Sequence, residues 1–300
     1  MLKNNKSLKT LLYGKIPPEL LGLIPSSYEI IGSRGGAVIV IQIPEKLKEY
    51  ENEIVQGLLV LHKNVKAVIK KVSERKGEYR LFDYHLLYGN STEVIHKEYG
   101  YFIKVDPLRV YFSAKDASDR IDIAKSVNPN EEILYMFAGV APYAVAICKY
   151  QPNVKKIIAI EKNEVAYKYM LETIKINKLE DKITPVLGDV KDVCPRYYDF
   201  ADRILMTLPL GSFEYLPLAL KCLKESGGLI HFYHIGKEGM LYNEAIELIS
   251  KYCKENKFYF SILKTKKINE YAPYKYKVRV DFYAKKLDSH NEHKNFSISL

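Results

Sequence analysis

The chain has 300 residues, of which 47% are hydrophobic and 27% charged, and its formal net charge is +10. These values are typical of a water-soluble globular protein with one large or two moderate domains, and no apolar run approaches the ~20 residues of a membrane span. The four cysteines form no CxxC pair, which argues against a disulfide framework or a metal site. We therefore expect a cytoplasmic protein with buried thiols, no metal and no membrane contact, and a monomer is favoured.

Positive charge gathers at both ends of the chain. The first sixteen residues carry four lysines and no acid, and residues 264–286 carry eight Lys and Arg residues against Glu270 and Asp281. Four tyrosines are interleaved with this second group of cations: Tyr271, Tyr274, Tyr276 and Tyr283. Cations attract phosphates and aromatic rings stack on bases, so the pattern suits a polyanion. A solvated edge strand protected by lysines is the equally open alternative.

The N-terminal part predicts a small α+β domain over residues 17–108, preceded by a basic arm or short helix at 1–16. A helix is expected from 44 to 62 because its apolar residues recur three to four positions apart. Strands are expected where β-branched and aromatic residues cluster between turn residues. These strands are 28–32, 37–43, 65–72, 79–87, 92–97 and 101–106.

Residues 109–286 predict a second domain of a different kind. A connector and helix reach residue 127, and strands then alternate with helices before a final β-rich segment. Such alternation predicts an α/β fold with a mainly parallel sheet, whose ligands bind beyond the carboxyl ends of the strands. Residues 287–300 form a polar tail. The expected strands are 133–138, 155–160, 183–187, 202–207, 227–234, 258–265 and 276–284.

Turns after the first three strands of this domain carry the candidate cofactor site. An acid that ends the second strand, just over twenty residues beyond a glycine turn, can accept hydrogen bonds from a ribose diol. Both NAD and S-adenosylmethionine (AdoMet) fit this arrangement. A single glycine followed by Ala141 and Pro142 makes a poor pyrophosphate cradle, so the sequence favours AdoMet. The residues concerned are Phe137, Gly139, Val140, Pro142, Glu161, Lys162, Gly188, Asp189 and Val190.

The fourth strand ends in a short polar segment with Thr207 and Pro209. Proline cannot pair its backbone nitrogen, so such a turn leaves carbonyl groups available to a base that is to be modified. An ordinary βα loop with a proline near a helix start is the simpler reading. These residues alone do not choose between the two.

Several motifs, in order, resemble the archaeal and eukaryotic tRNA (guanine-37)-N1 methyltransferases, which modify the nucleotide just 3′ of the anticodon. The matching segments are residues 110–113, 136–143, 202–209 and 271–273, with 62–66 and 77–80 in the smaller domain. The resemblance runs from about residue 23 to about residue 285. It implies a Rossmann-like class I methyltransferase domain with a smaller N-terminal α+β domain. AdoMet would be the cofactor, and the anticodon-loop region of tRNA the partner.

The resemblance also implies roles for single residues. Tyr111, Val140, Glu161 and Asp189 would surround the cofactor, and Lys115 stands where the family has an arginine. The general-base glutamate of the family falls on Asp119 and its catalytic arginine on Arg80. Its asparagine-leucine-proline motif falls on Thr207, Leu208 and Pro209.

These residue types suit methylation of guanine N1. The N1 atom is a poor nucleophile until it loses its proton, which a carboxylate at that position could take. An arginine near O6 would stabilise the negative charge that develops there. The sulfonium methyl group needs in-line placement, so much of the remaining catalysis would be positioning.

Departures from the family pattern leave the substrate range open. Aspartate replaces glutamate at Asp119, threonine replaces asparagine at Thr207, and Ala141 replaces the second glycine of the turn. No segment of these 300 residues resembles the separate N-terminal RNA-binding domain of the family. Some archaeal members also methylate C7 of a tricyclic wyosine intermediate at the same nucleotide. Two alternatives remain: an aminocarboxypropyl transferase of wyosine synthesis, and a non-catalytic tRNA-binding protein.

Overall fold

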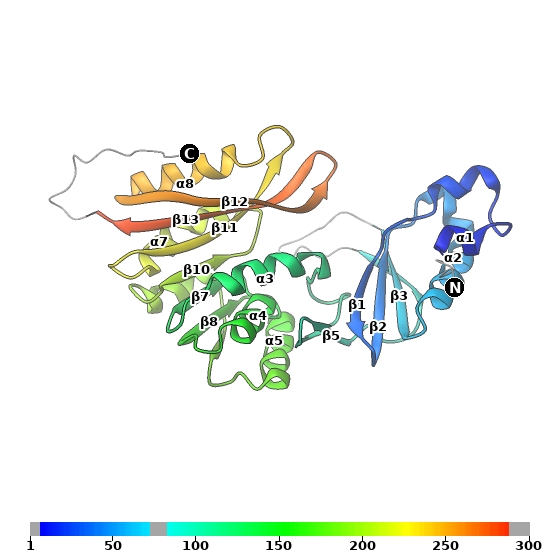
Figure 1. Cartoon of the computed structure of the whole chain (residues 1–300), viewed down its shortest axis with the longest axis horizontal. Coiled ribbons are helices and arrows are strands. Elements are labelled where there is room, and N and C mark those ends of the chain that lie inside the picture. Colours follow the sequence, from blue (N-terminus) through cyan, green and yellow to red (C-terminus); the bar gives the residue numbers. More distant parts are fainter. Residues whose placement is uncertain (1–6, 73–82, 288–300) are drawn as a thin grey trace, which may run out of the picture. The chain divides into compact units, whose positions relative to one another are not determined.

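The computed structural model describes residues 7–72 and 83–287. The chain divides into two compact units, Met1–Lys115 and Asp116–Leu300 (Figure 1). This division lies seven residues after the boundary at 108/109 that we placed from the sequence, because the connector that contains Tyr111 belongs to the first unit.

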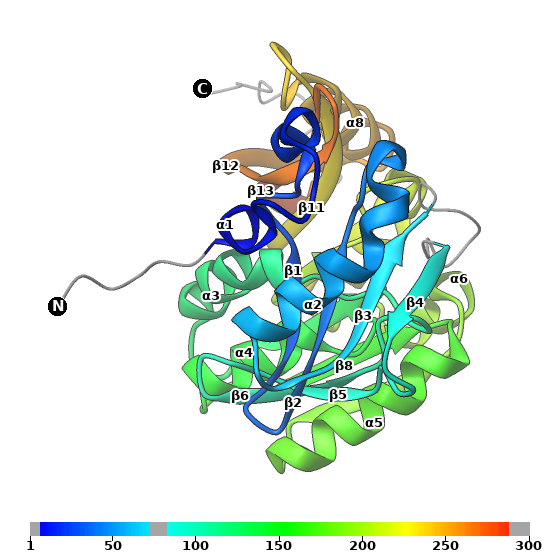
Figure 2. The ribbon, with the colours of Figure 1, turned by 90° about the vertical axis from the view of Figure 1, so that its right-hand side faces the viewer.

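The N-terminal unit is a four-stranded sheet covered by helices and accompanied by a hairpin. The sheet order is β1-β2-β3-β4, and β2 and β3 run parallel while the outer pairs run antiparallel. Figure 2 shows α2 in front of this sheet, and apolar side chains of α1 and α2 share one core with β2 and β3. The elements are α1 (Leu8–Leu12), η1 (Pro18–Leu23), β1 (Glu29–Ser33), β2 (Gly36–Ile41), η2 (Glu45–Tyr50), α2 (Glu51–Leu61), β3 (Val65–Lys71), β4 (Tyr84–Tyr88), β5 (Val94–Glu98) and β6 (Tyr101–Val105).

The C-terminal unit is a seven-stranded sheet with helices on both faces. Its order is β12-β13-β11-β10-β7-β8-β9; the five strands from β11 to β9 are parallel, and β13 and β12 are antiparallel. The elements are η3 (Ala114–Asp116, across the unit boundary), α3 (Ala117–Ser126), β7 (Glu132–Met136), α4 (Pro142–Tyr150), β8 (Lys156–Glu161), α5 (Glu164–Asn177), β9 (Ile183–Leu187), α6 (Val190–Val193), η4 (Cys194–Tyr197), β10 (Arg203–Met206), η5 (Ser212–Tyr215), α7 (Leu216–Cys222), β11 (Gly228–Lys237), α8 (Asn243–Glu255), β12 (Phe258–Ala272) and β13 (Lys275–Lys286).

This topology confirms the predicted α/β fold. The strand order runs outward from β7 to β9 and then returns to β10 on the other side of β7. The crevice at such a reversal, beyond the carboxyl ends of the strands, is where open α/β sheets bind their ligands. The candidate site predicted from the sequence lies at this edge of the sheet. The sequence analysis predicted β12 and β13 too short, since both continue past the expected 258–265 and 276–284.

The two faces of this sheet differ in chemistry because side chains alternate along each strand. One face is an apolar core shared with α6, α7 and α8, to which the strands contribute side chains such as Met136, Met206 and Phe232. On the opposite face lie α3, α4 and α5 (Figure 1). That face carries Tyr135 and the buried polar residue His231.

Within the described residues, no helix is both long enough and apolar enough to cross a membrane. The same residues contain no group of three or more His, Cys, Asp or Glu side chains that could hold a metal ion. All four cysteines are free and buried, which confirms the prediction for the thiols.

Candidate functional site

The turn between β7 and α4 lies at the strand-order reversal and has an unusual backbone. Phe137, Gly139 and Ala141 have φ angles of 60°, 57° and 61°, all left-handed. The Ala141 N–H donates to the Ala138 carbonyl oxygen at 2.9 Å, and Pro142 then opens α4 at a position that needs no N–H. A Cβ atom built on Gly139 would meet nothing within 4 Å. The space in front of Gly139 is therefore open to a ligand.

Glu161, the last residue of β8, joins this turn to the next one. One carboxylate oxygen accepts the Gly139 N–H at 2.7 Å, and the other accepts the Asn163 N–H at 2.7 Å. Burial raises the pKa of Glu161, and the backbone N–H groups of Asn163, Gly139 and Lys162 oppose that rise without cancelling it. A carboxylate so placed lies beside the open turn and keeps lone pairs for a hydroxyl donor.

Asp189 follows β9 at the next strand end. Its side chain caps α6 by accepting the Lys191 N–H at 2.9 Å, and Lys162 forms an ion pair with it at 2.9 Å. Although burial works against the charged form, the Lys191 N–H and the Lys162 ammonium group lower the pKa of Asp189. Its neighbours Gly188 and Val190 lie in the same turn, and the Gly188 N–H donates to the Glu161 carbonyl oxygen at 2.9 Å. Asp189 is thus ionised and fixed.

Thr207 brings the fourth strand end to the same place. Its hydroxyl donates to the Phe137 carbonyl oxygen at 3.2 Å, immediately beyond the paired residues Met206 and Met136. Pro209 is buried two residues further on. The structure therefore gathers the residues predicted from four separate strand ends at one edge of the sheet: Phe137, Gly139, Val140, Pro142, Glu161, Lys162, Gly188, Asp189, Val190, Thr207 and Pro209.

Other predicted residues are not part of these strand ends. Tyr111 and Lys115 belong to the N-terminal unit, where both are exposed. Lys115 lines a pocket of about 520 Å³ in that unit, together with Tyr28, Glu29 and others. Arg80 lies outside the described residues.

Asp119 lies on α3 in a fully buried position, with none of its surface exposed. The hydroxyl of Tyr143 donates to its carboxylate at 2.9 Å, and the Tyr233 hydroxyl and the Arg279 guanidinium donate to it as well. The Lys266 ammonium group is the fourth contact, 3.5 Å from the Asp119 carboxylate. Burial, with the Asp119 charge as the next cause, raises the pKa of both tyrosines well above the ordinary value, so both hydroxyls keep their protons.

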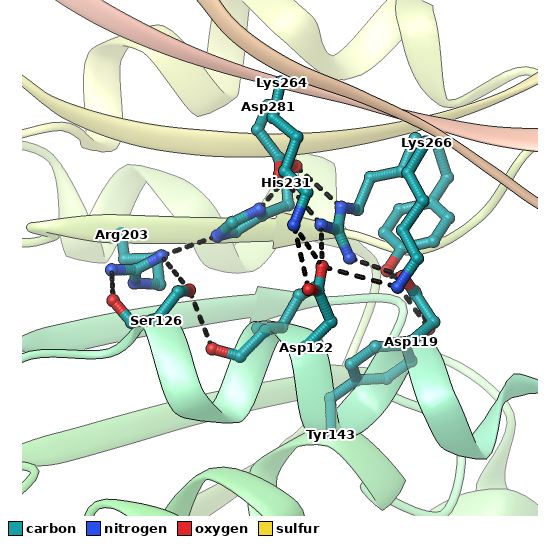
Figure 3. A network of polar contacts seen from close by, with 12 residues as sticks. Asp119, Asp122, Ser126, Tyr143, Arg203, His231, Lys264, Lys266 and Asp281 are labelled. Atoms are coloured by element: carbon teal, nitrogen blue, oxygen red, sulfur yellow. Dashed lines mark hydrogen bonds and ion pairs between the residues drawn. The ribbon is translucent and has the colours of Figure 1, made fainter.

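Asp119 is one member of a larger network between α3 and the sheet (Figure 3). Arg279 also binds Asp122 at 2.5 Å and Asp281 at 2.8 Å. The network continues through His231, whose ring nitrogens contact Asp281 and Arg203 at 2.7 Å each, and Arg203 in turn binds the Glu131 carboxylate. Burial lowers the pKa of His231 despite the neighbouring carboxylate, which favours a neutral ring.

The sequence analysis missed this network, although two periodicities pointed to it. Asp116, Asp119 and Asp122 recur every three residues, which places them on one face of a helix. Lys277, Arg279 and Asp281 alternate along β13, which places them on one face of a strand. In the structure these two faces meet, with Lys277 bound to Asp116 at 2.6 Å in the same cluster.

Family profiles match both parts of the chain. The profile described as "TYW2 N-terminal domain" matches residues 8–92, and "TRM5/TYW2 methyltransferase domain" matches residues 94–261.

Three relatives illustrate the range of activities within this similarity. Over 268 residues the chain is 37% identical to the tRNA (guanine(37)-N(1))-methyltransferase Trm5b of Pyrococcus abyssi, covering 89% of this chain and 77% of the relative. It is 32% identical to a tRNA(Phe) (4-demethylwyosine(37)-C(7)) aminocarboxypropyltransferase of Pyrococcus horikoshii, covering 89% and 92%. A tRNA (guanine(37)-N(1))/4-demethylwyosine(37)-methyltransferase of Nanoarchaeum equitans is 27% identical, covering 86% and 99%.

Solved structures of both Trm5 and TYW2 proteins are similar to this chain. The crystal structure of Trm5b from Pyrococcus abyssi superposes with a TM-score of 0.83 at 35% identity, covering 95% of this chain and 82% of the other. A complex of aTrm5 with tRNALeu superposes with a TM-score of 0.79 at 35% identity, covering 93% of this chain and 78% of the other. TYW2 of P. horikoshii in complex with MeSAdo gives 0.78 at 30% identity, covering 93% and 98%.

Proposed function

Because this chain belongs to the TRM5/TYW2 methyltransferase family, we propose that it transfers the methyl group of AdoMet to N1 of guanine 37 in tRNA. C7 of the tricyclic wyosine intermediate at the same nucleotide is a second acceptor in this proposal, since the relative of Nanoarchaeum equitans is also named a 4-demethylwyosine(37)-methyltransferase. The observation that carries the proposal is the contact between Glu161 and Gly139 at the strand-order reversal, beside an open turn.

The strand-end residues would divide the work of holding AdoMet. Glu161 would accept the ribose hydroxyls, since its two oxygens already lie at the turn and retain lone pairs. Asp189 would accept the exocyclic amine of the adenine. The open space at Gly139 would admit the methionine part, and Thr207 would fix the Phe137 carbonyl beside it. Tyr111 and Lys115 remain proposed cofactor contacts.

Methyl transfer to guanine N1 breaks the bond between sulfur and the methyl carbon, forms the bond from N1 to that carbon and releases the N1 proton. The role of Asp119 as acceptor of this proton stays a prediction. It requires the carboxylate to leave at least one of its present donors, because all four contacts are made inside the protein. The alternative for Asp119 is a positioning role, in which it holds α3 against the sheet.

The competing activity is aminocarboxypropyl transfer, in which a different carbon on the AdoMet sulfur is attacked. It is favoured by the match of residues 8–92 to the TYW2 N-terminal domain and by the 92% coverage of the P. horikoshii transferase. The 37% identity to Trm5b favours methyl transfer.

Nucleoside mass spectrometry after incubation with defined tRNA tests both activities. We expect 1-methylguanosine from an unmodified transcript with guanine at position 37 and no product when adenine replaces it. Arg80→Ala should lower the methylation rate by at least about 100-fold, because an electrostatic partner of the developing charge is lost. An aminocarboxypropyl product on the wyosine precursor, with no methylated guanosine, would reject the proposal in favour of the competing activity.

The raised pKa of Glu161 predicts a pH dependence of cofactor binding. The charged carboxylate is the better acceptor for a ribose diol, so AdoMet affinity should fall as the pH is lowered through that raised pKa. Without AdoMet, the stability of the fold should depend on pH in the opposite direction. Protonation of Glu161 at low pH should stabilise the fold, and this gain should be lost as the pH rises. Calorimetric titration of wild type and Glu161→Gln across pH checks this, and equal pH profiles in the two proteins would contradict it.

A further inference from the structure

The ribbon of β12 and β13 extends past the edge of the sheet that carries the candidate site (Figure 1). β10 ends at Met206, which pairs with Phe232 of the parallel strand β11. Pairing between β11 and β13 continues from Phe232 to Lys237, five residues further (237 − 232), where Lys237 meets Lys275. At ~3.3 Å per residue the ribbon projects about 16 Å beyond the end of β10. Its turn therefore overhangs the side on which Gly139, Glu161 and Thr207 lie.

Four of the eight Lys and Arg residues of this ribbon are paired with carboxylates. Lys264, Lys266, Lys277 and Arg279 bind the three aspartates of α3 and its cap, Asp122, Asp119 and Asp116. Among the described residues, Lys237, Lys267 and Lys275 have no carboxylate partner, and all three are exposed at the overhanging end. The two acids nearby are Glu238 and Glu270. Three cations without a carboxylate partner thus lie at the tip, and Lys285 and Lys286 are exposed at the other end of the ribbon.

Two tyrosines complete the tip. The Lys267 ammonium group lies 3.4 Å from the centre of the Tyr276 ring, a cation–π contact between the two side chains. Tyr274, in the turn, has a left-handed φ of 61° and is 73% exposed. Its carbonyl accepts the Glu238 N–H at 2.9 Å, which ties the turn to the loop after β11. An exposed aromatic ring that packs on little else contributes little to the fold and is available to stack on a ligand.

We propose that this tip binds unpaired nucleotides of the RNA, with Tyr274 stacked on a base and Lys237, Lys267 and Lys275 contacting phosphates. The inference rests on the proposed function for the identity of the RNA, a tRNA anticodon loop. Stacking needs only a flat ring and phosphate contacts need only a cation, so this surface would hold the loop without reading its sequence. Its place above the strand ends would keep a nucleotide beside the target base close to the cofactor turn.

The test measures the affinity of a fluorescent anticodon stem-loop for the full chain at several salt concentrations. Tyr274→Ala should weaken binding about 5- to 100-fold, and Tyr274→Phe should restore it because the ring stays. Replacing Lys237, Lys267 and Lys275 by glutamine should lower the slope of log affinity against log salt by up to about 2, at ~0.7 per phosphate. The matched controls, Tyr259→Ala and Lys285→Gln with Lys286→Gln, lie at the other end of the same ribbon and should leave affinity within twofold.

AdoMet titration of every variant verifies that the fold is intact, since none of these residues lies in the cofactor turns. The inference is overturned if Tyr274→Ala and the triple glutamine variant bind like wild type, if the controls weaken binding equally, or if wild type has no affinity for the RNA. Methylated product is assayed separately. Loss of RNA affinity in Tyr274→Ala, with no methylation by wild type, would support the inference and reject the proposed function. Wild-type RNA affinity in Tyr274→Ala, with methylation by wild type, would support the proposed function and reject the inference.

Discussion

Asp119→Ala is expected to lower the free energy of unfolding by about 3–5 kcal/mol, measured by chemical denaturation. The reason is the loss of one partner from a buried ionic cluster, which leaves the Arg279 charge and the Tyr143 and Tyr233 hydroxyls without the acceptor that they share. The control is Asp122→Ala. Asp122 binds the same guanidinium, but its side chain is 27% exposed, so its removal should cost about 1 kcal/mol.

A double-mutant cycle shows whether the cluster is the cause. Asp119→Leu combined with Arg279→Met should cost clearly less than the sum of the two single changes, because neither charge is then left unpaired. Additive losses would mean that the two side chains act independently.

Asp119→Asn separates a positioning role from a proton-acceptor role. If Asp119 only positions α3, the turnover that remains in Asp119→Asn should keep the pH profile of wild type. If Asp119 takes the N1 proton, the acidic limb of that profile, where the rate rises with pH, should disappear while AdoMet affinity is retained.

Glu161→Gln is expected to weaken AdoMet binding about 10- to 100-fold, measured by calorimetry. The carboxylate is replaced by an amide that has one acceptor oxygen in place of two, so it cannot serve the Gly139 and Asn163 N–H groups and a ribose diol together. Hydrogen bonds to charged groups are worth ~1.5–3 kcal/mol, which sets the size of the effect.

Stability distinguishes this effect from unfolding. The free energy of unfolding of Glu161→Gln should fall by at most about 1 kcal/mol, since burial already disfavours the charged form. Glu164→Gln is the matched control, because Glu164 is exposed in the first turn of α5, three residues away. Unchanged AdoMet affinity in Glu161→Gln would remove Glu161 from the site.

The strand-end site could be predicted because each of its parts is local in sequence. An apolar run predicts a buried strand, the next small or acidic residue marks its end, and parallel strands bring their ends to one edge. Gly139, Glu161 and Asp189 each follow this rule.

The environment of Asp119 could not be predicted in the same way. Its main partner, Arg279, is 160 residues away, and the pairing depends on β13 lying next to β11. We interpreted the Asp119 carboxylate from its motif alone, and only the structure shows that it is buried. The length of the β12–β13 ribbon was also missed, because alternating Lys and Tyr residues resemble a polar tail until their strand partners are known.

The position of β13 has a consequence for how the protein is made. β13, residues Lys275–Lys286, is the last strand that the structure describes, yet it lies inside the sheet between β11 and β12. A nascent chain that has emerged only as far as β11 still lacks the strand that pairs with its free side, so the sheet cannot close until residues 275–286 have also emerged. Removing residues from 275 onward would therefore delete an interior strand and leave β11 and β12 as open edges, which are sites of aggregation.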